Sequence, residues 1–269
     1  MRKLKVNKLI LSQGRPKIAV PITGRSHEQI IKDVKEAMKK PCDMLEWRAD
    51  YFFGEMDSLE EKVENTDAHM EMIRILDDID YQTDGMPLIF TIRGHGHGGR
   101  VAISREHAYD LASLAAQSGL VDFVDMELFD DDDTYNPEQV KNQIKEVHEF
   151  GTGVILSYHD YEAMPAPAVT VGLTNLMRDM GADIVKIAGT ASTREQAMEM
   201  MKVSELVTRG DELPVIFIAM GEEGRISRVI GGENGSAITF AKGREHTGEG
   251  QVEAAALSRL LDDYYSKKK

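Results

Sequence analysis

Polar residues recur at every second position where five apolar segments of the chain end. They are Glu46 and Arg48, Thr91 and Arg93, Asp125 and Glu127, Ser157 and His159, and, alone in the fifth segment, Lys186. Because alternate residues of a β-strand share one face, these side chains would point together, away from their apolar neighbours. Five such groups at equivalent depth predict a polar pocket that carries out chemistry.

Lys186 interrupts the apolar segment ADIVKIAG, residues 182–189. Apolar walls and the nearby Arg48 and Arg93 would disfavour its ammonium form, which lowers its pKa and leaves a neutral amine. A neutral lysine can attack a ketone or aldehyde and form a Schiff base. A protonated imine acidifies the adjacent carbon, and His159, which titrates near neutrality, is the natural base for that proton.

The elements that must position these residues are eight short apolar runs bounded by turn residues. Their ranges are 17–23, 42–50, 86–93, 123–129, 153–160, 182–189, 214–221 and 236–243. They are too continuously apolar to face water on one side, which is typical of parallel strands covered by helices. The sequence therefore predicts eight buried strands.

Helix signals lie between these runs. The cap candidates are Ser26 with Gln29, Thr193 with Gln196, and Asn136 with Pro137 at the first helical position. Residues 256–265 predict a terminal helix. Eight strands that alternate with helices favour a (β/α)8 TIM barrel, an α/β fold, although an open doubly wound sheet stays possible. No linker interrupts the pattern, so we expect a single catalytic domain over residues 1–269.

Composition narrows the classes of partner. A net charge of -14 argues against nucleic acid or an anionic membrane as partner, and an anionic ligand would need arginines gathered locally. Cys42 is the only cysteine, so we expect neither an internal disulfide nor a cysteine-bound metal. The apolar LIL near the N-terminus is too short for a signal peptide or membrane span, which predicts a cytoplasmic protein.

Seven motifs in order along the chain resemble one family, the type I 3-dehydroquinate dehydratases, which are Schiff-base enzymes of the shikimate pathway. They are LEWRAD 45–50, FTIR 90–93, DMELF 125–129, LSYHD 156–160, VKIA 185–188, GRISRVIGGENGSAITF 224–240 and HTGEGQ 246–251. The resemblance covers nearly the whole chain. It implies a barrel, commonly a homodimer, that converts 3-dehydroquinate into 3-dehydroshikimate without metal or organic cofactor.

The resemblance also implies roles for individual residues. Lys186 matches the imine-forming lysine and His159 the acid–base histidine, which takes the C2 proton and helps expel the C1 hydroxyl as water. Glu46, Arg48 and Arg93 match the family residues that hold the substrate's hydroxyls, and Arg228 and Gln251 match those that bind its carboxylate. Thr247 keeps a hydroxyl where the family has a serine.

Two departures from the family pattern bear on this site. The family usually has a glutamate four residues after the arginine of FTIR, where it orients the histidine, but this chain has His97. We therefore expect Glu46 to compensate. Gly189 replaces a bulkier residue, which predicts extra room near Lys186.

Other functions stay open. Another lysine-dependent barrel enzyme, such as an aldolase, would need a phosphate site after the last two strands, and no clear one is present. A relative that binds 3-dehydroquinate without turning it over would agree with His97 but not with the retained Lys186 and His159. His95 and His97 lack a third metal ligand. The same chemistry serves aromatic biosynthesis and quinate breakdown, so both roles fit.

Overall fold

The computed structural model describes residues 3–6, 9–55, 66–130, 134–210 and 212–267, so the ends of the predicted domain 1–269 lie outside it. Eight parallel strands form one sheet in the order β10-β3-β4-β5-β6-β7-β8-β9. Their bounds are β3 Lys17–Ile22, β4 Met44–Arg48, β5 Leu88–Thr91, β6 Phe123–Glu127, β7 Gly153–Asp160, β8 Ile184–Thr190, β9 Val215–Met220 and β10 Ile238–Phe240. A parallel bridge from Val215 to Ser236 joins β9 to the segment before β10. The predicted eight strands and the (β/α)8 barrel are confirmed, and an open sheet is not found.

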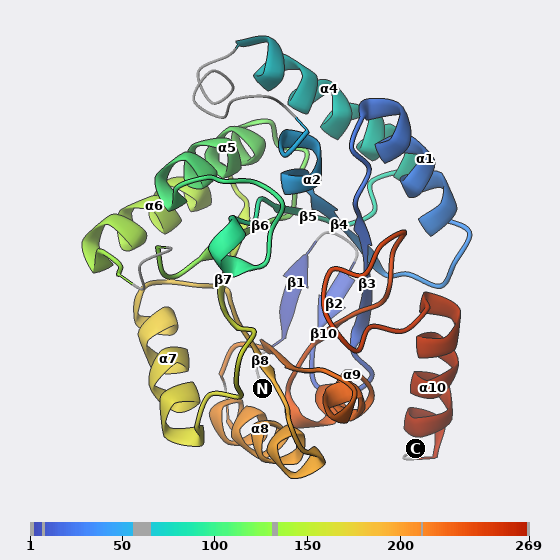
Figure 1. Ribbon diagram of the computed structural model, residues 1–269, viewed down its shortest axis with the longest axis vertical. Helices are drawn as coiled ribbons and strands as arrows, with labels where there is room; N and C mark the ends of the chain where they lie inside the picture. Colours follow the sequence, from blue (N-terminus) through green and yellow to red (C-terminus); the bar gives the residue numbers. More distant parts are fainter. Residues whose placement is uncertain (1–2, 7–8, 56–65, 131–133, 211, 268–269) are drawn as a thin grey trace.

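Helices surround the barrel (Figure 1). Their bounds are α1 His27–Ala37, α2 Ala49–Phe53, α4 Thr66–Thr83, α5 Arg105–Gln117, α6 Pro137–Glu149, α7 Pro167–Asp179, α8 Arg194–Val207, α9 Ser227–Ile230 and α10 Ala254–Ser266. Two short 3₁₀ helices in the described residues follow strands, η1 His95–His97 after β5 and η2 Glu223–Ile226 after β9, and a third, η3 Gly231–Asn234, follows α9. A large apolar core lies between these helices and the outer face of the strands.

The predicted helix caps are largely confirmed. Thr193 accepts from the backbone N–H of Gln196, whose side chain accepts from the backbone of Thr193, so α8 has a complete capping box. Asn136 caps α6, with a proline in its first turn. At α1 only half of the box forms, because the Gln29 side chain accepts from the N–H of Arg25 and not of Ser26.

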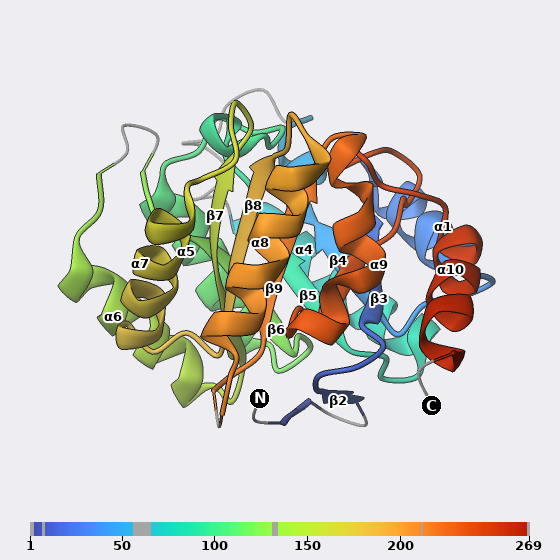
Figure 2. The same ribbon diagram turned by 90° about the horizontal axis from the view of Figure 1, so that it is seen from below.

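A short antiparallel hairpin, β1 Leu4–Val6 and β2 Leu9–Leu11, was not predicted. It lies below the barrel in Figure 2, beside the residues that begin the strands. Leu11 is fully buried and packs into the apolar cluster that fills the barrel interior. The hairpin therefore covers the amino-terminal ends of the strands and leaves the opposite end for function.

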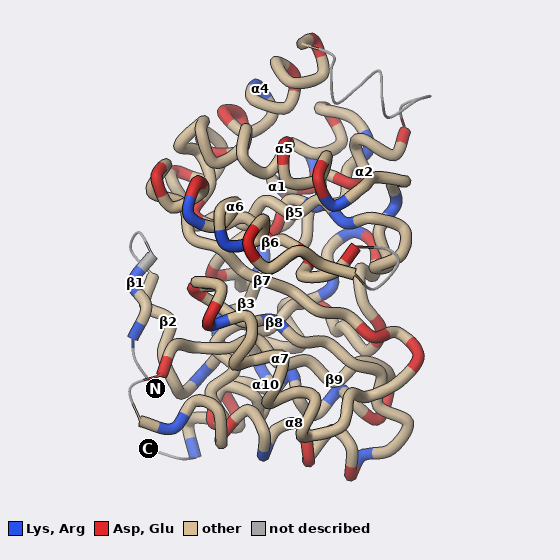
Figure 3. Tube along the Cα trace, turned by 90° about the vertical axis from the view of Figure 1, so that its left-hand side faces the viewer, with Lys and Arg blue, Asp and Glu red and all other residues tan. Residues whose placement is uncertain are grey.

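Charged residues of both signs are interspersed along the outer helices and loops (Figure 3). Among the described residues, no helix is long and apolar enough to cross a membrane. Within the same ranges, no group of three or more His, Cys, Asp or Glu side chains is placed to hold a metal ion.

Candidate active site

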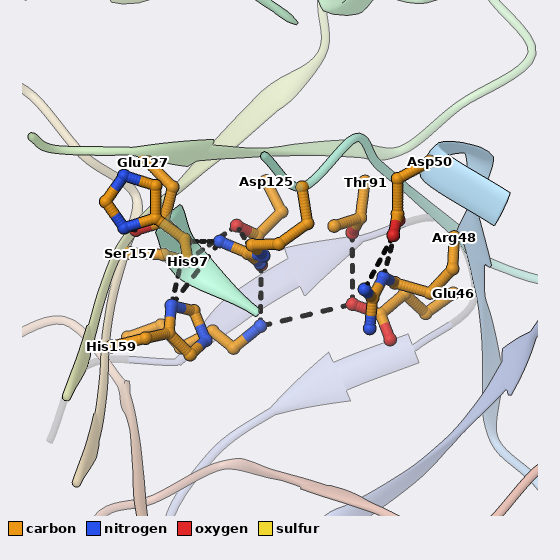
Figure 4. Close-up of polar contacts among 11 residues, drawn as sticks. Glu46, Arg48, Asp50, Thr91, His97, Asp125, Glu127, Ser157 and His159 are labelled. Atoms are coloured by element: carbon orange, nitrogen blue, oxygen red, sulfur yellow. Dashed lines mark hydrogen bonds and ion pairs between the residues drawn. The ribbon is translucent and has the colours of Figure 1, made fainter. Parts of the chain in front are cut away.

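The structure brings all eight predicted site residues into one pocket beyond the carboxyl ends of the strands, where enzymes with this fold hold their active sites. Its lining residues are Glu46, Arg48, Arg93, His159, Tyr161, Lys186, Ala188, Ile218, Met220, Arg228, Phe240, Thr247, Gly248 and Gln251. Figure 4 shows the polar contacts on one side of this pocket, among residues of β4 to β8 and the loops that follow them.

The sheet register explains why the polar side chains meet. Glu127 on β6 is the register partner of Ser157 on β7, and Ser157 is the partner of Lys186 on β8. His159 lies two residues further along β7 and therefore faces the same way, one step closer to the strand end.

The ammonium group of Lys186 is buried, and its nearest charged neighbours are two carboxylates. Its Nζ donates to Asp125 Oδ2 at 2.7 Å and lies 4.0 Å from Glu46 Oε1. Its Nζ also lies 4.8 Å from the centre of the Phe240 ring. The prediction that arginines crowd this lysine is therefore incomplete, because its nearest charged partners are anions.

Asp125 links the lysine to the rest of the site. Its Oδ1 accepts from Arg93 at 2.9 Å and from the Ser157 hydroxyl at 2.6 Å. Burial alone would raise the pKa of Asp125, but the charges of Arg93 and Lys186 outweigh it and lower that pKa to about 2. Asp125 is thus a fixed anion at the centre of the network.

His159 lies against Glu127, a residue of β6 that also forms an ion pair with Arg93. Its Nδ1 is 2.8 Å from Glu127 Oε1, and both side chains are about 7% exposed. Burial, reinforced by the charges of Arg93 and Lys186, holds the pKa of His159 well below its usual value. The imidazole is therefore neutral at neutral pH and can accept a proton.

The sequence led us to expect Glu46 beside His159, but the carboxylate there belongs to Glu127. Glu46 accepts from the Thr91 hydroxyl at 3.0 Å instead. His97 cannot replace the missing glutamate, because a histidine supplies no anion. Its Nδ1 lies 3.9 Å from Glu127 Oε2.

Two of the predicted substrate-binding arginines are already paired with carboxylates. Arg48 donates to both oxygens of Asp50, at 2.7 and 2.8 Å. Arg93 contacts both Asp125 and Glu127. These ion pairs fix the two guanidinium groups at the pocket wall.

Arg228 differs from both. It is only 4% exposed, and its guanidinium donates to the backbone carbonyls of Phe240 and Glu249, at 3.2 and 2.7 Å. Its buried Nε has no hydrogen-bond partner. Burial, followed by the neighbouring charge of Arg225, lowers the pKa of Arg228 to about 10. In the described ranges no carboxylate pairs with it, so the pocket holds a buried cation suited to an anionic ligand.

Thr247 and Gln251 are hydrogen-bonded to one another on either side of Glu249, whose carbonyl accepts from Arg228. The backbone N–H of Thr247 donates to the Gln251 side-chain oxygen, and the Gln251 amide donates to the Thr247 hydroxyl, both at 2.9 Å. The pair presents an amide and a hydroxyl close to Arg228, which lines the same pocket.

The sequence reasoning placed Asp125 and Glu127 on the polar face but gave them no role, and it missed Tyr161 entirely. The Tyr161 ring stacks on His159 with centroids 6.1 Å apart. Strand alternation could identify the two acids, whereas Tyr161 follows β7 in a loop for which no periodicity exists.

Gly189 does not make room near Lys186, so that prediction is wrong. A Cβ atom at Gly189 would meet Pro165 Cδ at 2.4 Å and Met164 Sδ at 3.1 Å. Its missing side chain faces the segment that leads into α7, away from the pocket.

Comparisons with known proteins agree with this architecture and this set of residues. A family model described as type I 3-dehydroquinase matches residues 18–268. The 3-dehydroquinate dehydratase of Bacillus licheniformis is 32% identical over 263 residues, which covers 97% of each chain. That of Salmonella typhimurium is 32% identical over 262 residues, with 97% of this chain and 98% of the relative covered.

Solved structures show the same likeness. A type I 3-dehydroquinate dehydratase from Clostridium difficile, with covalently modified comenic acid, superimposes with a TM-score of 0.86 at 30% identity. The match covers 99% of this chain and 98% of that one. On the family match over nearly its whole length and on these relatives, the chain belongs to the type I 3-dehydroquinase family.

Proposed function

We propose that this chain is a hydro-lyase that removes water from 3-dehydroquinate, through a Schiff base on Lys186 with His159 as acid and base. The observation that carries the proposal is that both residues line one pocket with Arg228, a buried cation that has no carboxylate partner among the described residues. The named relatives are 3-dehydroquinate dehydratases, which supports the choice of substrate.

The proposed reaction follows from the chemistry of the two residues. The Lys186 amine, after losing a proton, adds to the substrate ketone, and loss of water gives a protonated imine. The neutral His159 takes the C2 proton, and the electron pair of that C–H bond forms an enamine. The enamine then expels the C1 hydroxyl, which leaves as water with the proton from His159. Addition of water to the imine releases 3-dehydroshikimate and restores Lys186.

The substrate's carboxylate has one natural position in this scheme. Arg228 can engage it, with the Gln251 amide and the Thr247 hydroxyl beside it. Glu46, Arg48 and Arg93 line the same pocket, where they would meet the ring hydroxyls. A homodimer and a cytoplasmic location remain predictions.

Ultraviolet absorbance during incubation with 3-dehydroquinate tests the proposal, because loss of water creates a conjugated enone. We expect a rise with the wild-type chain and none with Lys186→Ala. Lys242→Ala is the matched control, because Lys242 is paired with Glu253 at 3.3 Å outside the pocket, and should keep full activity. Turnover by Lys186→Ala at the wild-type rate would show that the Schiff-base mechanism is wrong.

Borohydride trapping separates the two catalytic roles. His159→Ala should still form an imine that borohydride reduces onto Lys186, but it should not release product. A flat absorbance trace from folded wild-type chain that still binds 3-dehydroquinate would favour the non-catalytic binder instead.

A further inference from the structure

Glu127 holds a position that the proposed reaction requires but that no motif marks. Its Oε1 lies 2.8 Å from His159 Nδ1, and its Oε2 lies 3.9 Å from His97 Nδ1. Figure 4 shows Glu127 between the two histidines. The carboxylate is thus placed to contact one histidine with each oxygen.

Neither of the other two acids beside Lys186 is available to His159. Asp125 uses Oδ1 for Arg93 and Ser157 and Oδ2 for Lys186. Glu46 accepts from Thr91. Glu127 Oε1, by contrast, is buried, is ion-paired with Arg93 and lies 2.8 Å from His159 Nδ1. At this separation a small rotation can align a hydrogen bond between His159 and Glu127 beside the ion pair with Arg93. Catalytic hydrogen bonds often tighten in this way when substrate binds.

The contact determines which ring nitrogen carries hydrogen. A carboxylate only accepts, so alignment requires a hydrogen on Nδ1, which leaves Nε2 of His159 as the proton acceptor. Arg93 Nη1 lies 3.4 Å from Nδ1 and could donate only to a bare Nδ1, which favours the opposite tautomer, but the same Nη1 is ion-paired with Glu127 Oε1. The shorter contact with Glu127 therefore sets the tautomer.

The charges around the ring give Glu127 a second effect. Burial and the positive groups Arg93, Lys186, His97 and Arg48 all oppose a proton on His159. When the histidine takes a substrate proton, an imidazolium forms among these cations. Glu127 is the carboxylate in contact with that ring, so it stabilises the imidazolium at the moment it forms.

We propose that Glu127 is the positioning residue of His159. This carboxylate of β6 orients the imidazole and stabilises the imidazolium, which His97 cannot do because a histidine supplies no anion. The proposal rests on the proposed function, since it assigns the group that prepares the proposed base. It adds Glu127 to the site and explains the position of His97, which lies next to the other carboxylate oxygen, Oε2.

Glu127→Gln tests the proposal because it removes the charge with almost no change in shape. We expect kcat to fall by about 100-fold or more, because loss of the partner that orients a functional histidine costs roughly 10- to 100-fold and a wrong tautomer costs more. Borohydride should still trap the imine, since Lys186 is intact. The acid limb of the kcat profile should move to lower pH, because the imidazolium loses its anion. Glu146→Gln, an exposed glutamate that accepts from Ser113 on α5, is the matched control and should change neither quantity.

A double variant asks whether the charge itself is what matters. His97 and Glu127 line a second cavity, which leaves space for a glutamate at position 97. Adding His97→Glu to Glu127→Gln should restore part of kcat and return the acid limb toward the wild-type pH. A merely structural role for Glu127 predicts no such rescue. Glu127→Asp provides a charged variant should the amide variant fail to fold.

The ring nitrogen signals of His159 give a readout that does not depend on turnover. In the wild-type chain, ¹⁵N NMR should show hydrogen on Nδ1 and a bare Nε2. The opposite tautomer, or a Glu127→Gln variant with wild-type kcat and pH profile, would overturn the proposal. Absence of dehydration by the wild-type chain would instead count against the proposed function and leave the tautomer measurement valid.

Discussion

Arg228 is the residue whose surroundings predict most about the ligand. Its guanidinium is buried and, among the residues that the structure describes, donates only to carbonyl oxygens and pairs with no carboxylate, so it is free to bind an incoming carboxylate. We expect Arg228→Met to raise KM by roughly 100-fold, since a charge-assisted contact of about 3 kcal/mol is lost, with little effect on kcat. Steady-state kinetics with 3-dehydroquinate measures both constants. Arg209→Met, an exposed arginine paired with Glu205, is the control; an unchanged KM for Arg228→Met would remove Arg228 from the binding site.

The lowered pKa of Asp125 predicts how the free energy of unfolding changes with pH. Its pKa is lowered from 3.8 to about 2 in the folded chain, so its ionisation stabilises the fold above about pH 4. That stabilisation, about 2 kcal/mol, is lost as the pH falls toward about 2. Asp125→Asn should destabilise the fold at neutral pH by roughly 3 to 5 kcal/mol, because Lys186 and Arg93 lose their anion. Urea unfolding of both chains should show this difference narrowing between about pH 4 and pH 2, whereas parallel curves would contradict the assignment.

How much of the site the sequence could reveal depends on what fixes each residue. Alternation along a strand is local, so it correctly put Lys186 and His159 on one face. The contact between His159 and Glu127 depends instead on the register of β6 against β7, which no local pattern specifies. The sequence therefore predicted which residues line the pocket better than which of them contact one another. It assigned to Glu46 the contact with His159 that Glu127 makes.

At the scale of elements, Gly189 of β8 packs against the segment that precedes α7. A side chain there would displace Pro165, so Gly189→Ala should cost about 1 to 3 kcal/mol of stability. Gly172, inside α7, has nothing within 4 Å of an added Cβ, and Gly172→Ala should stabilise the fold by about 0.5 to 1 kcal/mol. Urea unfolding midpoints distinguish the two changes. Equal effects would mean that close packing at Pro165 does not determine the cost.

The strands were predictable because each is a continuous apolar run buried on both faces, a pattern that few other structures share. The hairpin β1–β2 was not, because its strands have only 3 residues each and β2 shows a mixed burial pattern. The run LIL of β2 is apolar, but it is too short to indicate any element of its own. What they pack against is visible only once the barrel has formed, since the cluster around Leu11 comes from strands distant in the sequence.

At the scale of the whole molecule, the barrel separates stability from chemistry along its axis. The pocket lies beyond the carboxyl ends of the strands, whereas the hairpin packs at their amino-terminal ends. Between them the interior is filled by apolar side chains such as Ile155 and Ile216. A change at the hairpin should therefore alter the free energy of unfolding without altering the site.

Leu11 and Ile10 test this separation, because they are neighbours on β2 with opposite surroundings. Leu11 is fully buried in the barrel interior, while Ile10 is 48% exposed. Leu11→Ala should cost about 2 to 5 kcal/mol, through lost burial and the cavity left behind, whereas Ile10→Ala should cost about 0.5 kcal/mol or less. Urea unfolding measures the cost, and KM for 3-dehydroquinate measures the site. We expect KM to stay unchanged in both variants, since the intact barrel interior separates β2 from Lys186; a tenfold rise for folded Leu11→Ala would show that the two ends of the barrel are coupled.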